Sequence, residues 1–397
     1  MLLKNSPAGI ENRGSPDEPL RQRLFTPGPT PIPERVQAAM AGTPVYHRGP
    51  EFPALLRNAV QGLQEVFPTS YDVFLLSCSG TGVMEAAVAN TLCAGDRALV
   101  VQAGQFGARW TDLCRAYGVE VVEREFPWGE AVDPQVVAEA LRDDPGLRVV
   151  FATQSETSTG VLHDVASIGE IVSETGTLLV VDGVSSVAAH PLPLEAWNVD
   201  LAVTASQKGL MLPPGMGMAA VGPRVWKAHG RSRLPKFYWD LEGYRRSLAE
   251  GRAPATLPVT LMAGLRAALQ MLREEGIPQV WERHARHARA VRRSAAALGL
   301  TSFARQPSNA LTAILLPGGV DGLALMEYMR RERGVVVGGG LGDYRGRMVR
   351  VSNLGHVDDA GILEAVSALE IGLRETGWKF EAGAGVKAAQ CVLKVSG

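Results

Sequence analysis

The stretch "TLLVVDGVSSVAAHPLPLEAWNVDLAVTASQK" (residues 177–208) contains two short apolar runs, at 177–182 and 201–206. Asp182 ends the first run, and Lys208 stands two residues after the second. Uninterrupted apolar runs of this length are typical of strands that are buried on both faces of a parallel sheet. Ligands of such sheets bind at the carboxyl ends of the strands, so Asp182 and Lys208 are candidate site residues.

Similar apolar runs occur on both sides of this stretch and alternate with helical patterns such as 82–92. The additional strands are predicted at 73–77, 97–102, 119–124, 147–153 and 217–222. Together with the two runs above, they predict an α/β domain with a mostly parallel sheet of seven strands.

The C-terminal part shows a second, smaller α/β pattern. Two amphipathic helices, at 256–276 and 277–299, are predicted ahead of it. Its further strands and helices are predicted at 311–316, 321–333, 334–340, 347–353 and 359–377. The domain organisation that we expect is a flexible N-terminal tail (1–24), a large domain with an N-terminal arm (25–275), a small C-terminal domain (276–385) and a C-terminal tail (386–397).

The composition excludes several classes of protein. Of 397 residues, 46% are hydrophobic and 20% are charged, which allows a large buried core. The net charge of −1 gives no footprint for nucleic acid or for an anionic membrane. No run reaches the roughly 18 apolar residues of a membrane span, and no signal peptide is evident. Four widely spaced cysteines fit reduced thiols, so we expect a cytoplasmic protein.

Lys208 and Asp182 suggest a common chemistry. Taken alone, either residue is an ordinary strand-end side chain. A desolvated lysine, however, has a lowered pKa, and its amine attacks carbonyl groups to form a Schiff base. A nearby carboxylate keeps the ring nitrogen of pyridoxal 5′-phosphate (PLP) protonated, which makes the ring an electron sink. The pair therefore indicates a PLP site.

A third segment, "SCSGTGVMEAA" (77–87), comes directly after a predicted strand and opens a helix. Backbone N–H groups and hydroxyls at a helix N-terminus form an anion site, which suits a cofactor phosphate. The alternative is a simple helix cap. The segment is neither a GxxxxGK[ST] phosphate loop nor a GxGxxG motif.

With these residues in place, the chain resembles the class V aminotransferases, a family of PLP-dependent enzymes of fold type I, and within it the alanine–glyoxylate and serine–glyoxylate aminotransferases. The resemblance covers most of residues 25–355. It rests on the segments "FTPGPTPIPERV", "YHRGPEF", "SCSGTGVMEAAVANTL", "TQSETSTGVL", "VDGVSSV", "SQKGLMLPPGM" and "GRMVRVSNLG", in this order.

The resemblance implies a role for each matching residue around the cofactor ring. Lys208 would form the Schiff base with PLP and then move a proton, and Asp182 would pair with the ring nitrogen. Val184 would pack on one face of the ring, and Phe106 would stack on the other. Thr157 would contact the ring edge near the phenolic oxygen.

The phosphate region is implied in the same way. Ser79, Gly80, Thr81 and Gln207 would hold the phosphate of their own subunit. Thr256 would reach the phosphate of the neighbouring subunit, since active sites of this family form at a homodimer interface. One departure is Ala253, which stands where some relatives have a tyrosine, so that one phosphate contact would be missing.

Substrate contacts are implied for two further residues. Arg350 would hold the α-carboxylate of a substrate, because a guanidinium fork fits a carboxylate. Gly28 would line the pocket from the N-terminal segment. The loop 338–347, which carries Tyr344 and Arg347, is expected to cover the entrance.

Two other features have simpler interpretations. Cys78 lies just before the predicted phosphate residues. Its thiol could have a lowered pKa beside a helix N-terminus, or it could simply pack in the core, and packing is favoured. His284 and His287 are three residues apart on a helix among arginines, which favours a solvated face over a metal site. We therefore expect no metal.

Three functions remain open. The first is a ping-pong aminotransferase that moves the amino group of serine or alanine to glyoxylate or a similar small 2-oxo acid. The second is another PLP enzyme on the same scaffold: a lyase, a decarboxylase or a specialised biosynthetic enzyme. A cysteine desulfurase is disfavoured, because no cysteine lies between Cys114 and Cys391. The third is a non-catalytic complex subunit, since some relatives with a tail like "GAGVKAAQ" (383–390) are labelled as hydrogenase-associated.

Overall fold

A seven-stranded sheet forms the centre of the computed structural model, which describes residues 22–393. The strands lie in the order β2-β10-β9-β8-β5-β3-β4, and within this sheet only β10 runs against its neighbours. Their bounds are β2 (Asp72–Leu76), β3 (Arg97–Gln102), β4 (Glu120–Glu125), β5 (Leu147–Thr153), β8 (Leu178–Asp182), β9 (Leu201–Ala205) and β10 (Gly217–Val221). The prediction of a mostly parallel seven-stranded sheet is confirmed.

The apolar strands are continuous because helices cover both faces of this sheet. In β5, Val150 belongs to one core, whereas Val149 and Phe151 belong to the core on the opposite face. The first core also contains α2 (Phe52–Val66), α5 (Pro134–Asp143), α6 (Val165–Ser173) and α9 (Val259–Glu275). The second contains α3 (Gly80–Thr91), α4 (Gln105–Ala116), α7 (Pro223–Arg231) and α8 (Leu241–Ala249). Successive side chains of a strand point to opposite faces, so both must be apolar here.

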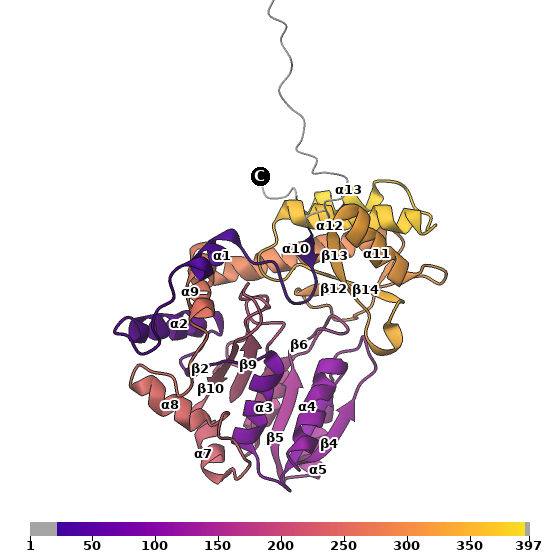
Figure 1. The fold of residues 1–397 in the computed structure, drawn as a ribbon. Helices are drawn as coiled ribbons and strands as arrows, with labels where there is room; N and C mark the ends of the chain where they lie inside the picture. Colours follow the sequence, from indigo (N-terminus) through magenta and orange to yellow (C-terminus); the bar gives the residue numbers. More distant parts are fainter. Residues whose placement is uncertain (1–21, 394–397) are drawn as a thin grey trace, which may run out of the picture.

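A five-stranded sheet, in the order β1-β13-β14-β12-β11, forms the smaller unit. Figure 1 shows its orange and yellow helices gathered above it, apart from the large sheet. The strands are β1 (Arg23–Phe25), β11 (Thr301–Ser302), β12 (Leu311–Leu315), β13 (Val335–Gly339) and β14 (Met348–Ser352). The helices are α10 (Ile277–Ala297), α11 (Gly322–Arg333), α12 (Asp359–Glu375) and α13 (Ala384–Leu393), with a 3₁₀ turn at Gly342–Tyr344.

The ends of the described chain differ from the sequence-based expectation. β1 pairs in parallel with β13, so the first described residues join the small sheet before the chain passes to α1 (Glu34–Ala41), which packs on α9 beside the large sheet (Figure 1). At the other end, the segment expected to be a tail from residue 386 lies largely within α13, which packs against α10 and α12. The remaining parts of the two expected tails, 1–21 and 394–397, lie outside the described residues.

No helix between residues 22 and 393 has both the length and the apolar character needed to cross a bilayer. Within the same range, no three His, Cys, Asp or Glu side chains are grouped so that they could hold a metal ion.

Candidate active site

Lys208 lies just beyond β9 with its side chain buried. Its ammonium group donates a hydrogen bond to the backbone carbonyl of Pro27. The pKa of Lys208 is lowered to about 8, mainly by burial. The carboxylate of Asp182 opposes this shift, and the cations of Arg350 and Arg109 add to it. A lysine in this state holds a substantial neutral fraction near neutral pH, which a nucleophilic amine requires.

Asp182 is the last residue of β8, the strand next to β9, and is also buried. Its Oδ1 accepts a hydrogen bond of 2.7 Å from the backbone N–H of Val184. Burial raises the pKa of Asp182 to about 6, although the Val184 N–H and the cations of Lys208 and Arg109 act in the opposite direction. The carboxyl group is therefore mostly ionised at pH 7, and adjacent parallel strands bring it to the same edge of the sheet as Lys208.

The N-terminal arm closes over Lys208. Gly28 has φ = +137°, and a Cβ placed on it would lie 2.7–2.8 Å from the Cε, Cδ and Nζ atoms of Lys208. Two residues on, the hydroxyl of Thr30 donates to the carbonyl of Lys208 at 3.0 Å. The structure thus places Gly28 against the lysine, because only a residue without a side chain fits there.

The segment predicted to hold a phosphate begins α3. Ser79 is its N-cap and accepts a hydrogen bond of 3.3 Å from the N–H of Gly82. Gly80 packs on Val184, since a Cβ on this glycine would lie 3.3 Å from Cγ2 of that valine. Gln207 lies beside Lys208, and its buried Oε1 has no hydrogen-bond partner in the described chain. A buried amide oxygen without a partner is a fit for a polar ligand.

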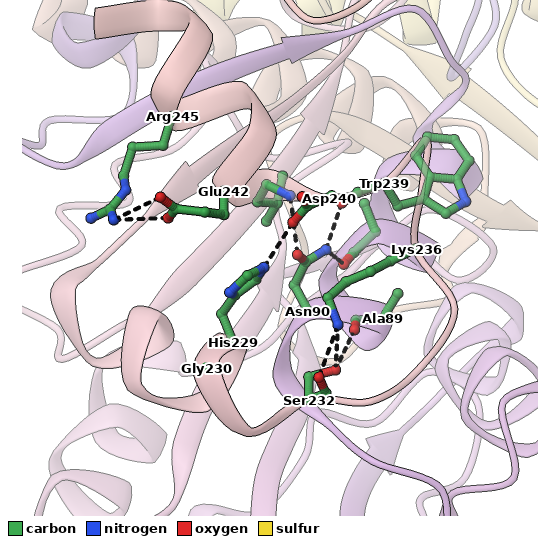
Figure 2. A network of polar contacts seen from close by, with 12 residues as sticks. Ala89, Asn90, His229, Gly230, Ser232, Lys236, Trp239, Asp240, Glu242 and Arg245 are labelled. Carbon is green, nitrogen blue, oxygen red and sulfur yellow. Dashed lines mark hydrogen bonds and ion pairs between the residues drawn. The ribbon is translucent and has the colours of Figure 1, made fainter.

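The segment before α8 is hydrogen-bonded to the last turn of α3 (Figure 2). Asn90, within α3, donates to the carbonyls of Ala86 and Trp239, both at 2.7 Å, and accepts from the N–H of Leu241 at 3.1 Å. The indole of Trp239 fills the space beside Gly82, where a Cβ would come within 2.9 Å of Cη2. This network fixes the helix that carries the predicted phosphate residues.

Phe106 stands in the first turn of α4 and is half-buried. The helix has no side-chain cap of its own, and the carboxylate of Glu156 serves in its place. Glu156 accepts from the N–H groups of Phe106 (3.1 Å) and Gly107 (2.9 Å), and from the N–H of Ser158 (2.9 Å). A carboxylate at a helix N-terminus satisfies unpaired N–H groups and interacts favourably with the helix dipole.

Glu156 is the residue that sequence reasoning missed. It lies within the quoted segment "TQSETSTGVL" and is completely buried in the short hairpin β6 (Ser155–Glu156) and β7 (Val161–Leu162). Its charge also acts on Lys208, Asp182 and Arg350, raising the pKa of each. The signal in the sequence was an acidic residue in an otherwise uncharged ten-residue segment.

Arg350 connects the small unit to the large one. It lies in β14, and its Nε donates to the carbonyl of Gly339 at 2.8 Å. Its Nη1 donates to the carbonyl of Thr157 at 2.7 Å, and the hydroxyl of Thr157 is hydrogen-bonded to that of Ser185. Burial lowers the pKa of Arg350 to about 10, so the guanidinium stays charged at neutral pH. The structure thus brings Arg350 and Thr157 into direct contact, and the roles expected of them toward substrate and cofactor stay predictions.

Thr256 lies apart from these residues, on the exposed surface beside the end of β2. Its carbonyl accepts a hydrogen bond of 3.1 Å from the hydroxyl of Ser77, and its hydroxyl is 3.4 Å from Nε2 of His47. Its reach to a neighbouring subunit stays a prediction.

Cys78 packs between Gly82 and Gly217, and burial raises the pKa of its thiol to about 12. The structure therefore agrees with packing and not with a reactive thiolate.

The loop after β13 contacts the large unit through Tyr344, whose ring stacks on Trp128 at 5.7 Å between centroids.

The expectation of a solvated face for His284 and His287 was wrong, because both side chains are completely buried. Nε2 of His284 accepts from the N–H of Gly355 at 3.1 Å, and Nε2 of His287 lies 2.8 Å from Oδ1 of Asp359. These partners lie about seventy residues away in sequence, just before and at the start of α12. Both histidines hold α10 onto the small unit.

Comparison with known proteins agrees with this site. The family model described as "Aminotransferase class-V" matches residues 24–356, so the chain belongs to the class V aminotransferase family, whose members use PLP. The fold and family expected from the sequence are thereby confirmed. The residues described above fit that cofactor, since they offer a buried amine, a buried carboxylate and an anion-binding helix end.

Three curated relatives cover nearly the whole chain. A "Soluble hydrogenase, small subunit" of Synechococcus sp. is 39% identical over 94% of this chain and 98% of its own. The serine–glyoxylate aminotransferase of Methylorubrum extorquens is 38% identical over 95% and 97%. The L-aspartate–glyoxylate aminotransferase of Paracoccus denitrificans is 37% identical over 92% and 95%.

Solved structures share the fold. Alanine–glyoxylate aminotransferase from Nostoc sp. is 32% identical, covers 92% of this chain and 100% of its own, and superposes with a TM-score of 0.86. Pyridoxamine–pyruvate aminotransferase from Mesorhizobium loti is 29% identical, covers 96% and 100%, and superposes with a TM-score of 0.91.

Proposed function

We propose that this aminotransferase uses PLP to move the amino group of a small amino acid, serine or alanine, to glyoxylate or a similar small 2-oxo acid. The observation that carries the proposal is the meeting of Lys208, Asp182 and Arg350 in one buried site where their charges act on one another. A scaffold protein needs none of these three buried charges, so the set argues against a non-catalytic role.

Each residue has a task that its environment allows. PLP, when bound, supplies an electron sink for chemistry at the Cα of an amino acid. Asp182, ionised above its pKa of about 6, holds a proton on the ring nitrogen of the cofactor. Lys208, partly neutral near pH 8, provides an amine that takes up and returns a proton.

Substrate choice follows from the charges around the pocket. Arg350 has two N–H groups engaged with backbone carbonyls and keeps a further amino group, Nη2, for a carboxylate. The resemblance to the family implies one arginine, Arg350, for the substrate carboxylate, which favours donors with one carboxylate. Aspartate is the competing donor, because Arg345 and Arg347 lie on the nearby loop and a relative is named for aspartate.

The homodimer with shared sites, the role of Thr256 at the partner's phosphate, and a cytoplasmic location are part of the same proposal. The resemblance within the family supports the first two. The net charge of −1 and four free cysteines support the third.

The test is a half-reaction without acceptor. Purified protein loaded with PLP is mixed separately with serine, alanine and aspartate, and the released cofactor is identified by mass spectrometry. We expect pyridoxamine phosphate and the matching 2-oxo acid from serine or alanine. Lys208→Ala abolishes this conversion, whereas Lys227→Ala, a change at an exposed lysine of α7, leaves it intact.

Three other results would redirect the proposal. If aspartate is converted faster than serine and alanine, the donor assignment is wrong. If no amino acid yields pyridoxamine phosphate but one yields a different product, the chain is a lyase or decarboxylase on this scaffold. A protein that binds no PLP would favour the non-catalytic reading.

A further inference from the structure

Arg109 links the two parts of the predicted cofactor site. It lies one turn after Phe106 in α4, so both side chains share a face of the helix. Its guanidinium carbon lies 4.8 Å from the centroid of the Phe106 ring. Its Nη1 also donates a hydrogen bond of 3.0 Å to the hydroxyl oxygen of Thr81, in the first turn of α3. One side chain therefore touches both the expected ring-stacking residue and an expected phosphate residue.

The charge of Arg109 has no carboxylate to neutralise it. Within residues 22–393, no acidic side chain lies at ion-pair distance from it, although the side chain is half-buried. Arg115, two turns further along α4, differs in this respect, because its guanidinium pairs with Glu123. The field of Arg109 reaches into the site, where it lowers the pKa of both Asp182 and Lys208. A partly desolvated cation is stabilised when an anion binds beside it.

The hydroxyl of Thr81 is prepared for the same anion. Its oxygen accepts the hydrogen bond from Arg109, which leaves the hydroxyl proton free to be donated elsewhere. The first-turn N–H groups of α3 point in the same direction along the helix axis. Guanidinium, hydroxyl and backbone donors thus converge at the start of α3.

We propose that Arg109 binds the 5′-phosphate of PLP, directly and by orienting the hydroxyl of Thr81. This assignment rests on the proposed function, because it needs PLP as the cofactor. Arg350 lies at the opposite, small-unit side of the site, where it suits a substrate carboxylate. Arg109 would therefore bind the phosphate of the cofactor, and Arg350 the carboxylate of the substrate.

The experiment compares ligands with and without a phosphate. Apoprotein of the wild type and of Arg109→Ala, Arg109→Lys and Arg115→Ala is titrated with PLP and with pyridoxal, and binding is followed by absorbance. We expect Arg109→Ala to raise the Kd for PLP about 10- to 100-fold, the range of one or two charge-assisted hydrogen bonds. The Kd for pyridoxal changes by less than about 3-fold, since the contact concerns only the phosphate.

The other variants separate charge from structure. Arg109→Lys keeps the charge but loses the fork, so it recovers part of the affinity for PLP. Arg115→Ala, on the same helix, behaves as wild type. Inorganic phosphate competes with pyridoxal phosphate in the wild type and loses this effect in Arg109→Ala, which shows that the anion itself is recognised.

Contrary results are distinguishable. If Arg109→Ala weakens PLP and pyridoxal equally, the residue only supports Phe106, and the proposal is overturned. If it weakens neither, Arg109 has no part in binding. If the wild type binds no PLP at all, the proposed function fails before Arg109 is tested. Should Arg109→Ala be unfolded by circular dichroism, Arg109→Lys and the phosphate competition in the wild type decide.

Discussion

Replacement of Gly28 by alanine tests how tightly the N-terminal arm closes over Lys208. The new methyl group would lie 2.7 Å from Cε and 2.8 Å from Nζ of the lysine, and the backbone at φ = +137° disfavours any side chain. Backbone strain costs about 1–3 kcal/mol, and overpacking costs about 1–3 kcal/mol. The lower entropy of the unfolded chain offsets about 0.4–1 kcal/mol of this. We expect Gly28→Ala to lower the free energy of unfolding by about 2–4 kcal/mol.

A matched control isolates the contact from the strain. Gly95 also has a positive φ, of +80°, but a Cβ on it meets no atom within 4 Å. Gly95→Ala therefore reports strain alone. In a Lys208→Ala background the overlap at Gly28 disappears, so Gly28→Ala should become less destabilising by about 1–2 kcal/mol, whereas Gly95→Ala should not change.

The assay is urea unfolding of the apoprotein, followed by fluorescence, for the wild type and the five variants. The reasoning is refuted if Gly28→Ala is as mild as Gly95→Ala, or if its effect is the same with and without the Lys208 side chain. In holoprotein, the same substitution should also slow the half-reaction, because a displaced Lys208 is no longer positioned for proton transfer.

Three further predictions follow from buried charges. Asp182 has a pKa of about 6 against an ordinary 3.8, so the folded apoprotein keeps a proton that the unfolded chain has lost between those values. Its contribution to stability falls by about 2 kcal/mol as the pH rises from 4 to 7, and Asp182→Asn removes this slope in urea titrations at the two pH values. Arg350→Lys keeps a charge but not the fork, so KM for the amino donor should rise about 10- to 100-fold in steady-state kinetics, and an unchanged KM would exclude Arg350 as the carboxylate partner. Glu156→Gln should weaken PLP binding through a misplaced Phe106, measured by absorbance titration. Glu123→Gln, in β4 and paired with Arg115 in the last turn of α4, should not.

Most of the large sheet was predictable because its signal is local. A strand such as 147–153 is a continuous apolar run, and burial on both faces is enough to produce one. The strand β1 was not predictable, since three residues, "RLF", carry no periodicity and its partner β13 begins more than three hundred residues later. The helix α13 was missed because the short segment 384–393 is stabilised mainly by packing on α10.

In the candidate site, too, residues with a local sequence signal were found, and residues whose partners are distant in sequence were missed. Lys208 and Asp182 stand at the ends of strands that the apolar pattern predicts, so the sequence marks them as candidates. The role expected of Arg350 comes from the resemblance to the family. Glu156 was missed because its role as a helix cap depends on backbone N–H groups of α4, about fifty residues earlier in the sequence. His287 was misjudged for a similar reason, since its neighbours in sequence are arginines and its partner Asp359 is distant.

The buried charges at this edge of the large sheet do not balance one another within the protein. Lys208, Arg350 and Arg109 carry positive charge there, against the carboxylates of Asp182 and Glu156, and Glu156 is already engaged by backbone N–H groups. The excess of positive charge favours the binding of anions. PLP would supply one anion, its phosphate, and an amino acid would supply the other, its carboxylate. A ligand that binds only the folded state stabilises it by mass action, so PLP should raise the melting temperature of this chain. Because the phosphate neutralises charge that the protein leaves unpaired at Arg109, PLP binds more tightly than pyridoxal, so the rise should be larger with PLP at equal ligand concentration, and the difference should shrink in Arg109→Ala.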